Sequence, residues 1–345
     1  MEYEYQQNAT LPGNYEESVA VNSRSNLPLR QAIKIVAEIF FQYDDGREDL
    51  EAQTQEITYF IHSLLAQKVI PGDADDWHNL AVDVARKDYF DLACDILDAG
   101  LRVFPNNTDL LGDYLQYGTS CHRISQCEMY YERLSRMPKV KYSWRSFHFS
   151  VNWLTYLWEQ SNEQEDLDRI TAELLALVAQ YRRYFPNSEE SYLCEASIHK
   201  LTKDTKKEIK SLSMPTTRSI PAPKCALRLA DHYFESGDYH KSLEMVQRSL
   251  KDSNQVQQAV NEAYLYYLSG LSRLSLIQNT HEPRDVQSIE DIYRDFESSL
   301  RLGIRPSLRD SMCKKAGLLL HQYDVKVPAQ CNKLFELLDD RDMLD

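Results

Sequence analysis

Glycine and proline are scarce in this sequence, and long apolar runs are missing. The 345 residues include only 10 Gly and 12 Pro, while 43% are apolar and 27% are charged. This composition indicates an ordered soluble protein made largely of helix. No run approaches the roughly 18 apolar residues that a membrane span needs, and the acidic N-terminal stretch MEYEYQQNATLPG does not resemble a secretory signal. We therefore expect a cytoplasmic protein with no membrane segment, and its length requires two cores or an elongated one.

Paired cysteine motifs are missing as well. The seven Cys are odd in number, scattered, and never spaced as C-x-x-C. Free, mostly buried thiols are therefore expected instead of disulfides or a zinc site. The formal net charge of −14 disfavours general binding to nucleic acid, although a local basic face is still compatible with it.

The sequence contains none of the common catalytic motifs. G-x-x-x-x-G-K-[ST], G-x-G-x-x-G, G-x-S-x-G and H-E-x-x-H are all absent. Cys121 and His122 are neighbours, but a Cys/His dyad is assembled from distant segments of a chain. His232 and His240 flank a turn at Gly237, where contacts with water or backbone are expected rather than a metal. We expect no enzymatic activity, no cofactor and no metal site.

Two apolar stripes with helical spacing run through residues 76–107. The first consists of Trp77, Leu80, Ala81 and Val84, and the second of Phe90, Ala93, Leu97 and Leu101. A polar break at 86–88 separates the stripes, and Pro105 ends the second. Two helices joined by so short a turn must pack antiparallel. Small residues at Ala81, Ala93 and Gly100 let the two backbones approach closely.

This arrangement resembles a tetratricopeptide repeat, a 34-residue helical hairpin with the pattern W-x2-L-G-x2-Y, then A-x3-F, then P. The pattern reads here as Trp77-x2-Leu80-Ala81-x2-Val84, then Ala93-x3-Leu97, then Pro105. Ala replaces the Gly of the pattern, and Val replaces the Tyr.

Two further copies support the resemblance. Adding 34 to six positions of the first copy (77, 80, 81, 90, 93 and 97) gives an apolar or aromatic residue each time, with Cys127 where a small residue is needed, and Pro138 falls one place early. Residues 223–256 contain the L-A-x2-Y part of the pattern, followed by a turn at Gly237. The resemblance therefore covers residues 74–140 and 223–256, and the repeats between them must be degenerate or lengthened.

The resemblance implies an all-α fold, in which antiparallel helix hairpins stack into a right-handed superhelical solenoid. The other apolar stripes also have helical spacing, and no convincing pair of strands is found. We expect a disordered acidic tail at 1–25, a repeat section at 26–201, a basic Ser/Pro-containing loop or hinge at 202–222, and a second repeat section with a capping helix at 223–345.

The resemblance also implies a binding surface, because the first helix of each hairpin lines the groove of tetratricopeptide repeats. The residues placed there are Asp75, His78, Asn79, Arg86, Asp109, Asp113, Gln116, Lys224, Arg228 and Asp231. A solvated surface is the leading interpretation of these aspartates, and the alternative is contact with a basic or hydroxyl-rich ligand. The Lys/Asn/Arg clamp of the chaperone-binding members is absent, because its places hold His78, Val82, Gly112 and Gln116.

Residues 141–158 contain three of the four Trp. One helical face consists of Trp144, Phe147, Val151, Leu154 and Trp158, and a second consists of Phe149, Trp153 and Tyr156. A helix that is apolar over so much of its circumference is typically buried within a stack. Alternatively, the second face forms an aromatic floor for a peptide, so that Trp153 and Tyr156 are partly accessible while Trp144 and Trp158 are buried.

Residues 200–224 carry six Lys and one Arg against one Asp and one Glu. They fit either a solvated loop or a docking segment for an acidic protein or a nucleic-acid backbone. No aromatic residue is interleaved for base stacking, which disfavours nucleic acid.

The leading functional hypothesis is a non-catalytic interaction module, acting as an adaptor, a scaffold or a regulatory subunit. Its groove would take a peptide or helix from a protein partner, of basic character if the aspartates contact it. A second hypothesis is a sensor that responds to a ligand or peptide. The third is a nucleic-acid-binding helical repeat that uses residues 200–224.

Overall fold

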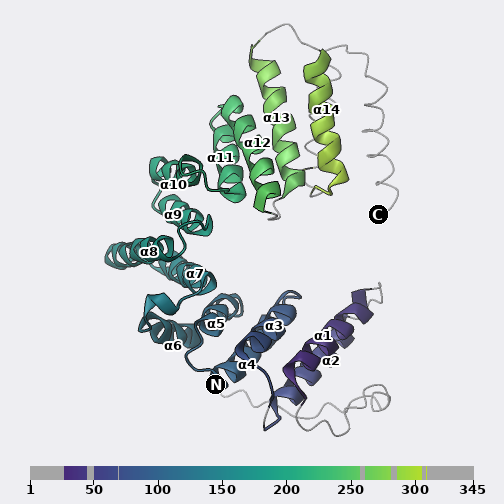
Figure 1. Ribbon diagram of the computed structural model, residues 1–345, viewed down its shortest axis with the longest axis vertical. Coiled ribbons are helices and arrows are strands. Elements are labelled where there is room, and N and C mark those ends of the chain that lie inside the picture. Colours follow the sequence, from purple (N-terminus) through teal and green to yellow (C-terminus); the bar gives the residue numbers. More distant parts are fainter. Residues whose placement is uncertain are drawn as a thin grey trace. The chain divides into compact units, whose positions relative to one another are not determined.

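The computed structural model of the protein describes residues 27–44, 50–68, 70–256, 261–280, 286–304 and 308. Fourteen α-helices and one short 3-10 helix (Lys139–Lys141) make up most of these residues, which contain no β-strand (Figure 1). The expected all-α fold is confirmed. The helices are α1 (Leu29–Asp44), α2 (Leu50–Leu65), α3 (Ala74–Ala85), α4 (Phe90–Val103), α5 (Thr108–Ser120), α6 (Ile124–Ser135), α7 (Trp144–Gln160), α8 (Gln164–Tyr184), α9 (Glu190–Leu201), α10 (Thr205–Thr217), α11 (Pro223–Glu235), α12 (Tyr239–Val256), α13 (Glu262–Thr280) and α14 (Val286–Arg301).

Helices that follow one another in the chain pack as hairpins. α1 packs on α2, α3 on α4, α5 on α6, α9 on α10, α11 on α12, and α13 on α14. The first helix of one hairpin also packs on the first helix of the next, as α1 does on α3 and α3 on α5. Between α7 and α8, Trp158 Nε1 donates a hydrogen bond of 3.1 Å to Thr171 Oγ1. The structure is thus a tetratricopeptide-repeat-like array of helix hairpins.

Small residues allow α3 and α4 to pack closely, as the sequence predicts. Ala81 and Ala93 are fully buried at the contact between the two helices. A side chain on Gly100 would place its Cβ only 3.0 Å from Cγ of Trp77, which is itself buried. The indole of Trp77 therefore fills the space that a larger residue at position 100 would need.

The turns within four hairpins share one backbone feature. Asp88, His122, Lys203 and Gly237 all have a positive φ, between 57° and 82°. The first two positions are 34 residues apart, and so are the last two, which is the length of a tetratricopeptide repeat. His122 and Lys203 are 81 residues apart, 13 more than two such repeats. The lengthening expected in the middle of the chain falls on α7 and α8, of which α8 alone has 21 residues.

The chain divides into two compact units, residues 1–153 and 154–345, with the boundary inside α7. The expected loop or hinge at 202–222 is wrong, because α10 occupies most of that segment and packs on both α9 and α11. Leu212 is buried there in a cluster with residues of α9 and α11. The apolar residues of α10 are few and lie among several Lys residues, so the sequence pattern did not indicate a helix there.

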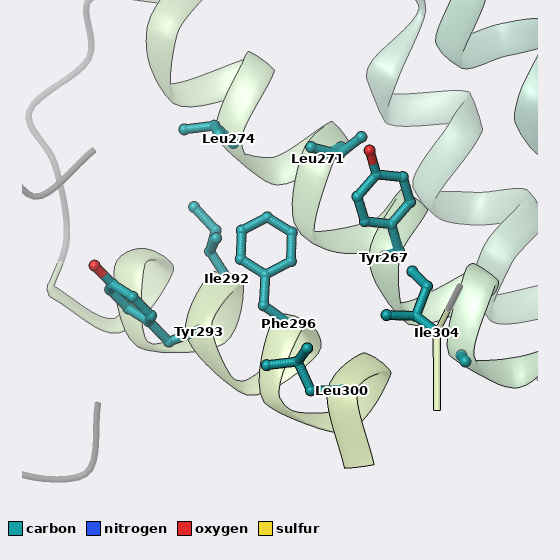
Figure 2. Packing of buried hydrophobic residues seen from close by; sticks show 9 residues of the cluster. Tyr267, Leu271, Leu274, Ile292, Tyr293, Phe296, Leu300 and Ile304 are labelled. Atoms are coloured by element: carbon teal, nitrogen blue, oxygen red, sulfur yellow. The ribbon is translucent and has the colours of Figure 1, made fainter. Parts of the chain in front are cut away.

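The second unit has an apolar core between α13 and α14 (Figure 2). Phe296 of α14 is fully buried there, between residues of α13 such as Tyr267 and Leu271. Gly270 leaves room for the ring, because a Cβ at that position would lie 2.4 Å from Cε1 of Phe296. Burial of these large side chains is the main stabilising contribution to the hairpin.

The tail expected at 1–25 and the capping helix expected near the C-terminus lie outside the described residues. Within the described ranges, no helix is both long enough and apolar enough to cross a membrane.

Candidate partner-binding surface

The first helices α3, α5 and α7 form the surface in the first unit to which the repeat resemblance points. Specific caps fix where two of them begin. The Asp73 carboxylate accepts the backbone N–H of Asp76 at 2.9 Å, and the Asp76 carboxylate accepts the N–H of Asp73 at 3.1 Å, which is a capping box. At the start of α5, Asn107 accepts the N–H groups of Asp109 and Leu110. These caps satisfy N–H groups that a helix start otherwise leaves unpaired.

A chain of polar contacts joins the three helices. Asp113 of α5 accepts a hydrogen bond of 2.5 Å from Nδ1 of His78 on α3. Arg145 of α7 donates to the other ring nitrogen, Nε2 of His78. The second guanidinium nitrogen of Arg145 lies 3.6 Å from the Asp109 carboxylate on α5. We call these four residues the polar bridge.

The contacts of His78 define its tautomer. Arginine only donates hydrogen bonds, so Nε2 must accept and Nδ1 must carry the proton that it donates to Asp113. An Asp–His pair resembles part of a general-base arrangement, but such a base needs its Nε2 available to a substrate. Here Arg145 occupies that atom. The polar bridge is therefore suited to holding three helices in register.

The structure corrects the role expected for Asp113. This carboxylate is only 1% exposed, so it does not present itself to a partner as the sequence analysis expected. Burial raises the pKa of Asp113, and the hydrogen bond from His78 opposes that rise. His78, with 14% of its side chain exposed, is largely covered as well. The sequence analysis did not select Arg145, because its role depends on the packing of α7 against both α3 and α5.

The other residues expected on this surface are more accessible. Asp75 and Asn79 of α3 are exposed, as is Arg86 directly after the helix, and Arg86 forms an ion pair with Asp83 at 3.1 Å. On α5, the side chain of Asp109 is 26% exposed. Half-buried Gln116 accepts a hydrogen bond of 3.0 Å from the amide of Asn152 on α7.

For Trp153 and Trp144 of α7, the structure shows the reverse of the exposure that the aromatic-floor alternative predicts. Trp153 is 1% exposed, whereas Trp144 is 48% exposed. Phe149, Tyr156 and Trp158 are half-buried. Trp153 is therefore part of the core of the protein and does not form an accessible aromatic floor.

Two serines explain the reversal. Ser146 and Ser150 are fully buried, because their hydroxyls donate to the backbone carbonyls of Thr108 at 2.9 Å and of Ser146 at 2.7 Å. The buried face of α7 therefore includes these small polar residues and extends around the helix to Trp153. A sequence pattern that treats serine as a surface residue places this face incorrectly.

In the second unit, the three expected residues of α11 contact neighbouring helices. Arg228 donates to Glu208 of α10 at 2.9 Å and to Ser197 of α9 at 3.0 Å. Asp231 accepts a hydrogen bond of 2.6 Å from the hydroxyl of Tyr264 on α13. Burial raises the pKa of Asp231. Lys224 donates to Glu190 of α9 at 2.6 Å, so these side chains bridge successive first helices in this unit too.

Comparisons with known proteins add to this description. No protein-family model matches the sequence, and no curated protein matches it. The hairpins are tetratricopeptide-repeat-like. Among solved structures, the chain is similar to a tetratricopeptide repeat protein from Parabacteroides merdae (14% identity, 83% of this chain and 99% of that one, TM-score 0.46). It is also similar to a thermophilic TPR protein from Thermus thermophilus (14%, 59% and 99%, 0.44). A third structure is a human IFIT1 dimer with m7Gppp-AAAA (13%, 89% and 75%, 0.39).

Proposed function

We propose that the protein is a non-catalytic interaction module, and that the first-helix surface of α3, α5 and α7 binds an extended segment of a protein partner. The polar bridge is the observation that carries this proposal. It holds three successive first helices in one arrangement before any partner binds, and such preorganisation lowers the entropic cost of binding.

The side chains left accessible on this surface suit a polypeptide backbone. Asn79 and Asn152 are exposed, and Gln116 is half-buried beside Asn152. A carboxamide both donates and accepts hydrogen bonds, so it pairs with the N–H and C=O groups of an extended peptide. Exposed Asp75 and the net charge of −14 favour a partner segment that is basic.

The test is a selection of random displayed peptides on the full-length protein. We expect the selected peptides to be rich in Lys and Arg. They should bind the wild type and an Asn187→Ala control equally, and should bind an Asn79→Ala/Asn152→Ala double variant at least tenfold more weakly. Asn187 is an exposed residue of the second unit and serves as the matched amide. Circular dichroism would establish that each variant is folded. Peptides that bind the double variant as tightly as the wild type would place the binding site elsewhere.

One observation favours a second candidate function, binding of nucleic acid. The exposed residues Lys206, Lys207 and Lys210 lie on one side of α10, because helix positions three and four apart are neighbours, and exposed Lys203 lies in the turn before that helix. If they bind a phosphate backbone, affinity for single-stranded RNA should fall steeply with salt concentration. It should also fall when Lys206 and Lys210 are replaced by Gln. Equal RNA affinity in this variant and the wild type would eliminate the candidate.

A further inference from the structure

A groove lies between the second helices α4 and α6 of the first unit, on residues that the proposed function does not use. Two adjoining hollows of about 390 and 520 Å³ form it. Both are lined by Met129, Tyr130 and Arg133 of α6, and the larger one also by Arg102 in the last turn of α4. We call it the α4–α6 groove.

The groove contains two guanidinium groups that its own acidic residues leave available. Among the described residues, neither Arg102 nor Arg133 forms an ion pair. The groove carboxylate Asp98 instead accepts a hydrogen bond of 2.5 Å from the hydroxyl of Tyr130. Burial and the neighbouring Asp98 raise the pKa of Tyr130, and the positive charges of Arg133 and Arg102 oppose that rise. Both arginines line the same hollow as Tyr130, so their charges lie in this part of the groove.

The third arginine of the groove differs from these two. Arg136 forms an ion pair with Glu132, one turn before it on α6. Its charge is therefore already compensated. In a chain with a net charge of −14, the side chains of Arg102 and Arg133 form a local positive site.

An exposed apolar side chain lies in the same groove. Met129 is 53% exposed and lines both hollows. The flexible thioether of methionine adapts to apolar side chains of different shapes, and methionine is frequent on surfaces that bind peptides. The groove thus combines two available cations with an adaptable apolar contact.

We propose that the α4–α6 groove binds an acidic segment of a protein partner. Carboxylates of the segment pair with Arg102 and Arg133, because the planar guanidinium matches the two oxygens of a carboxylate. An apolar side chain beside those carboxylates packs on Met129. The site is thus separate from the first-helix surface in both residues and preferred charge, and the two proposals stand or fall independently.

The test uses the full-length protein and three labelled synthetic 12-residue peptides, measured by fluorescence anisotropy. The first contains Asp and Glu around a central Leu, the second has Ala in place of the Leu, and the third has Lys in place of every acidic residue. We expect the first peptide to bind more tightly than the other two, and its affinity to decrease with added salt. Failure of the first peptide to bind the wild-type protein would overturn the proposal.

Variants then locate the binding. Arg102→Ala/Arg133→Ala should weaken binding of the first peptide at least tenfold, and Met129→Ala should weaken it several-fold. Arg136→Ala removes an arginine from the same groove and is the matched control, for which less than a twofold change is expected. Asn79→Ala/Asn152→Ala should leave the affinity unchanged.

Equal affinity in the double arginine variant and the wild type would overturn the proposal. Analytical sedimentation provides a second way to overturn the proposal. If the wild type forms a dimer and the double arginine variant does not, the groove is occupied by a second copy of the chain and not by a partner.

Discussion

Glu189 directly precedes α9 and links it to α11 by hydrogen bonds. Its carboxylate is 5% exposed and accepts the backbone N–H groups of Lys224 at 3.0 Å and Cys225 at 3.3 Å, so it caps the start of α11. Burial raises the pKa of Glu189 to about 7, although these N–H groups and the nearby Lys224 favour the charged form. Desolvation is therefore the stronger influence on this carboxylate.

The raised pKa of Glu189 predicts a specific dependence of stability on pH. Between the usual pKa of 4.5 and about 7, the folded protein holds a proton that the unfolded chain has lost. The free energy of unfolding should therefore fall as pH rises through this window, by about 3 kcal/mol at 1.4 kcal/mol per pH unit. Glu189→Gln, which cannot ionise, should remove that slope. Urea unfolding at several pH values between 4.5 and 8 measures it, and parallel curves for the two proteins would contradict the prediction.

Two tryptophans of α7 test the corrected position of its buried face. Trp153→Ala should reduce the free energy of unfolding by about 3–5 kcal/mol, because it removes a side chain that is 1% exposed. Trp144→Ala should cost less than about 1 kcal/mol, because that side chain is 48% exposed. Denaturant midpoints for the two variants provide the measurement. If Trp144→Ala proves the more damaging, the buried face has been placed wrongly.

Among the elements, the hairpin turns repeat most regularly along the chain. A backbone conformation with positive φ is adopted readily by glycine. For a residue with a side chain, this conformation costs roughly 1–2 kcal/mol. Gly237 meets this requirement, whereas His122 occupies the equivalent place with a φ of 61°. After each of them the next N–H bonds back across the end of the helix, from Arg123 to Gly118 O and from Asp238 to Tyr233 O, both at 2.8 Å. This pattern closes the end of the first helix.

The two turns therefore predict opposite effects of glycine. His122→Gly should raise the free energy of unfolding by about 1 kcal/mol, since it relieves the strain without removing a buried contact. Gly237→Ala should lower it by about 1 kcal/mol, although nothing lies within 4 Å of the added Cβ, because only the backbone conformation is affected. Thermal or urea unfolding of both variants tests this. A loss of stability in His122→Gly would show that its side chain has a role that the turn geometry does not reveal.

At the scale of the molecule, extensive contacts among the described helices α1 to α14 join only helices that are one or two places apart in chain order. Contacts of this kind make the stability of a repeat protein a sum of hairpin and nearest-neighbour contributions. The division into two compact units is consistent with this property, because each described helix packs on helices that are near it in the chain.

Destabilisation of one hairpin should therefore remain local. Gly270→Ala would place a Cβ 2.4 Å from the ring of Phe296, and we expect this overpacking to cost about 1–3 kcal/mol. Amide hydrogen exchange should accelerate in α13 and α14 and stay unchanged in α3 to α6. An equal acceleration along the chain would indicate that the array unfolds as one cooperative unit.

The sequence by itself determined the all-α fold and the positions of the most regular hairpin features. Trp77 and Ala93 indicated a helical hairpin in the sequence, because each belongs to a stripe of apolar residues whose spacing is that of a helix. The same local logic identified Gly237 as a turn, and its positive φ bears this out. Residue spacing was enough wherever a helix buries its face against its immediate neighbour in the chain.

Only the tertiary structure decided which side of α7 is buried and which polar residues meet. The buried face of α7 depends on the hydroxyl of Ser146 reaching the carbonyl of Thr108, 38 residues earlier in the chain. The contact of Arg145 with His78 spans 67 residues and joins helices of different hairpins. Helical periodicity describes a single helix and its own stripe of side chains. Contacts between successive hairpins depend on how the helices are offset and rotated against one another, and that is set by packing.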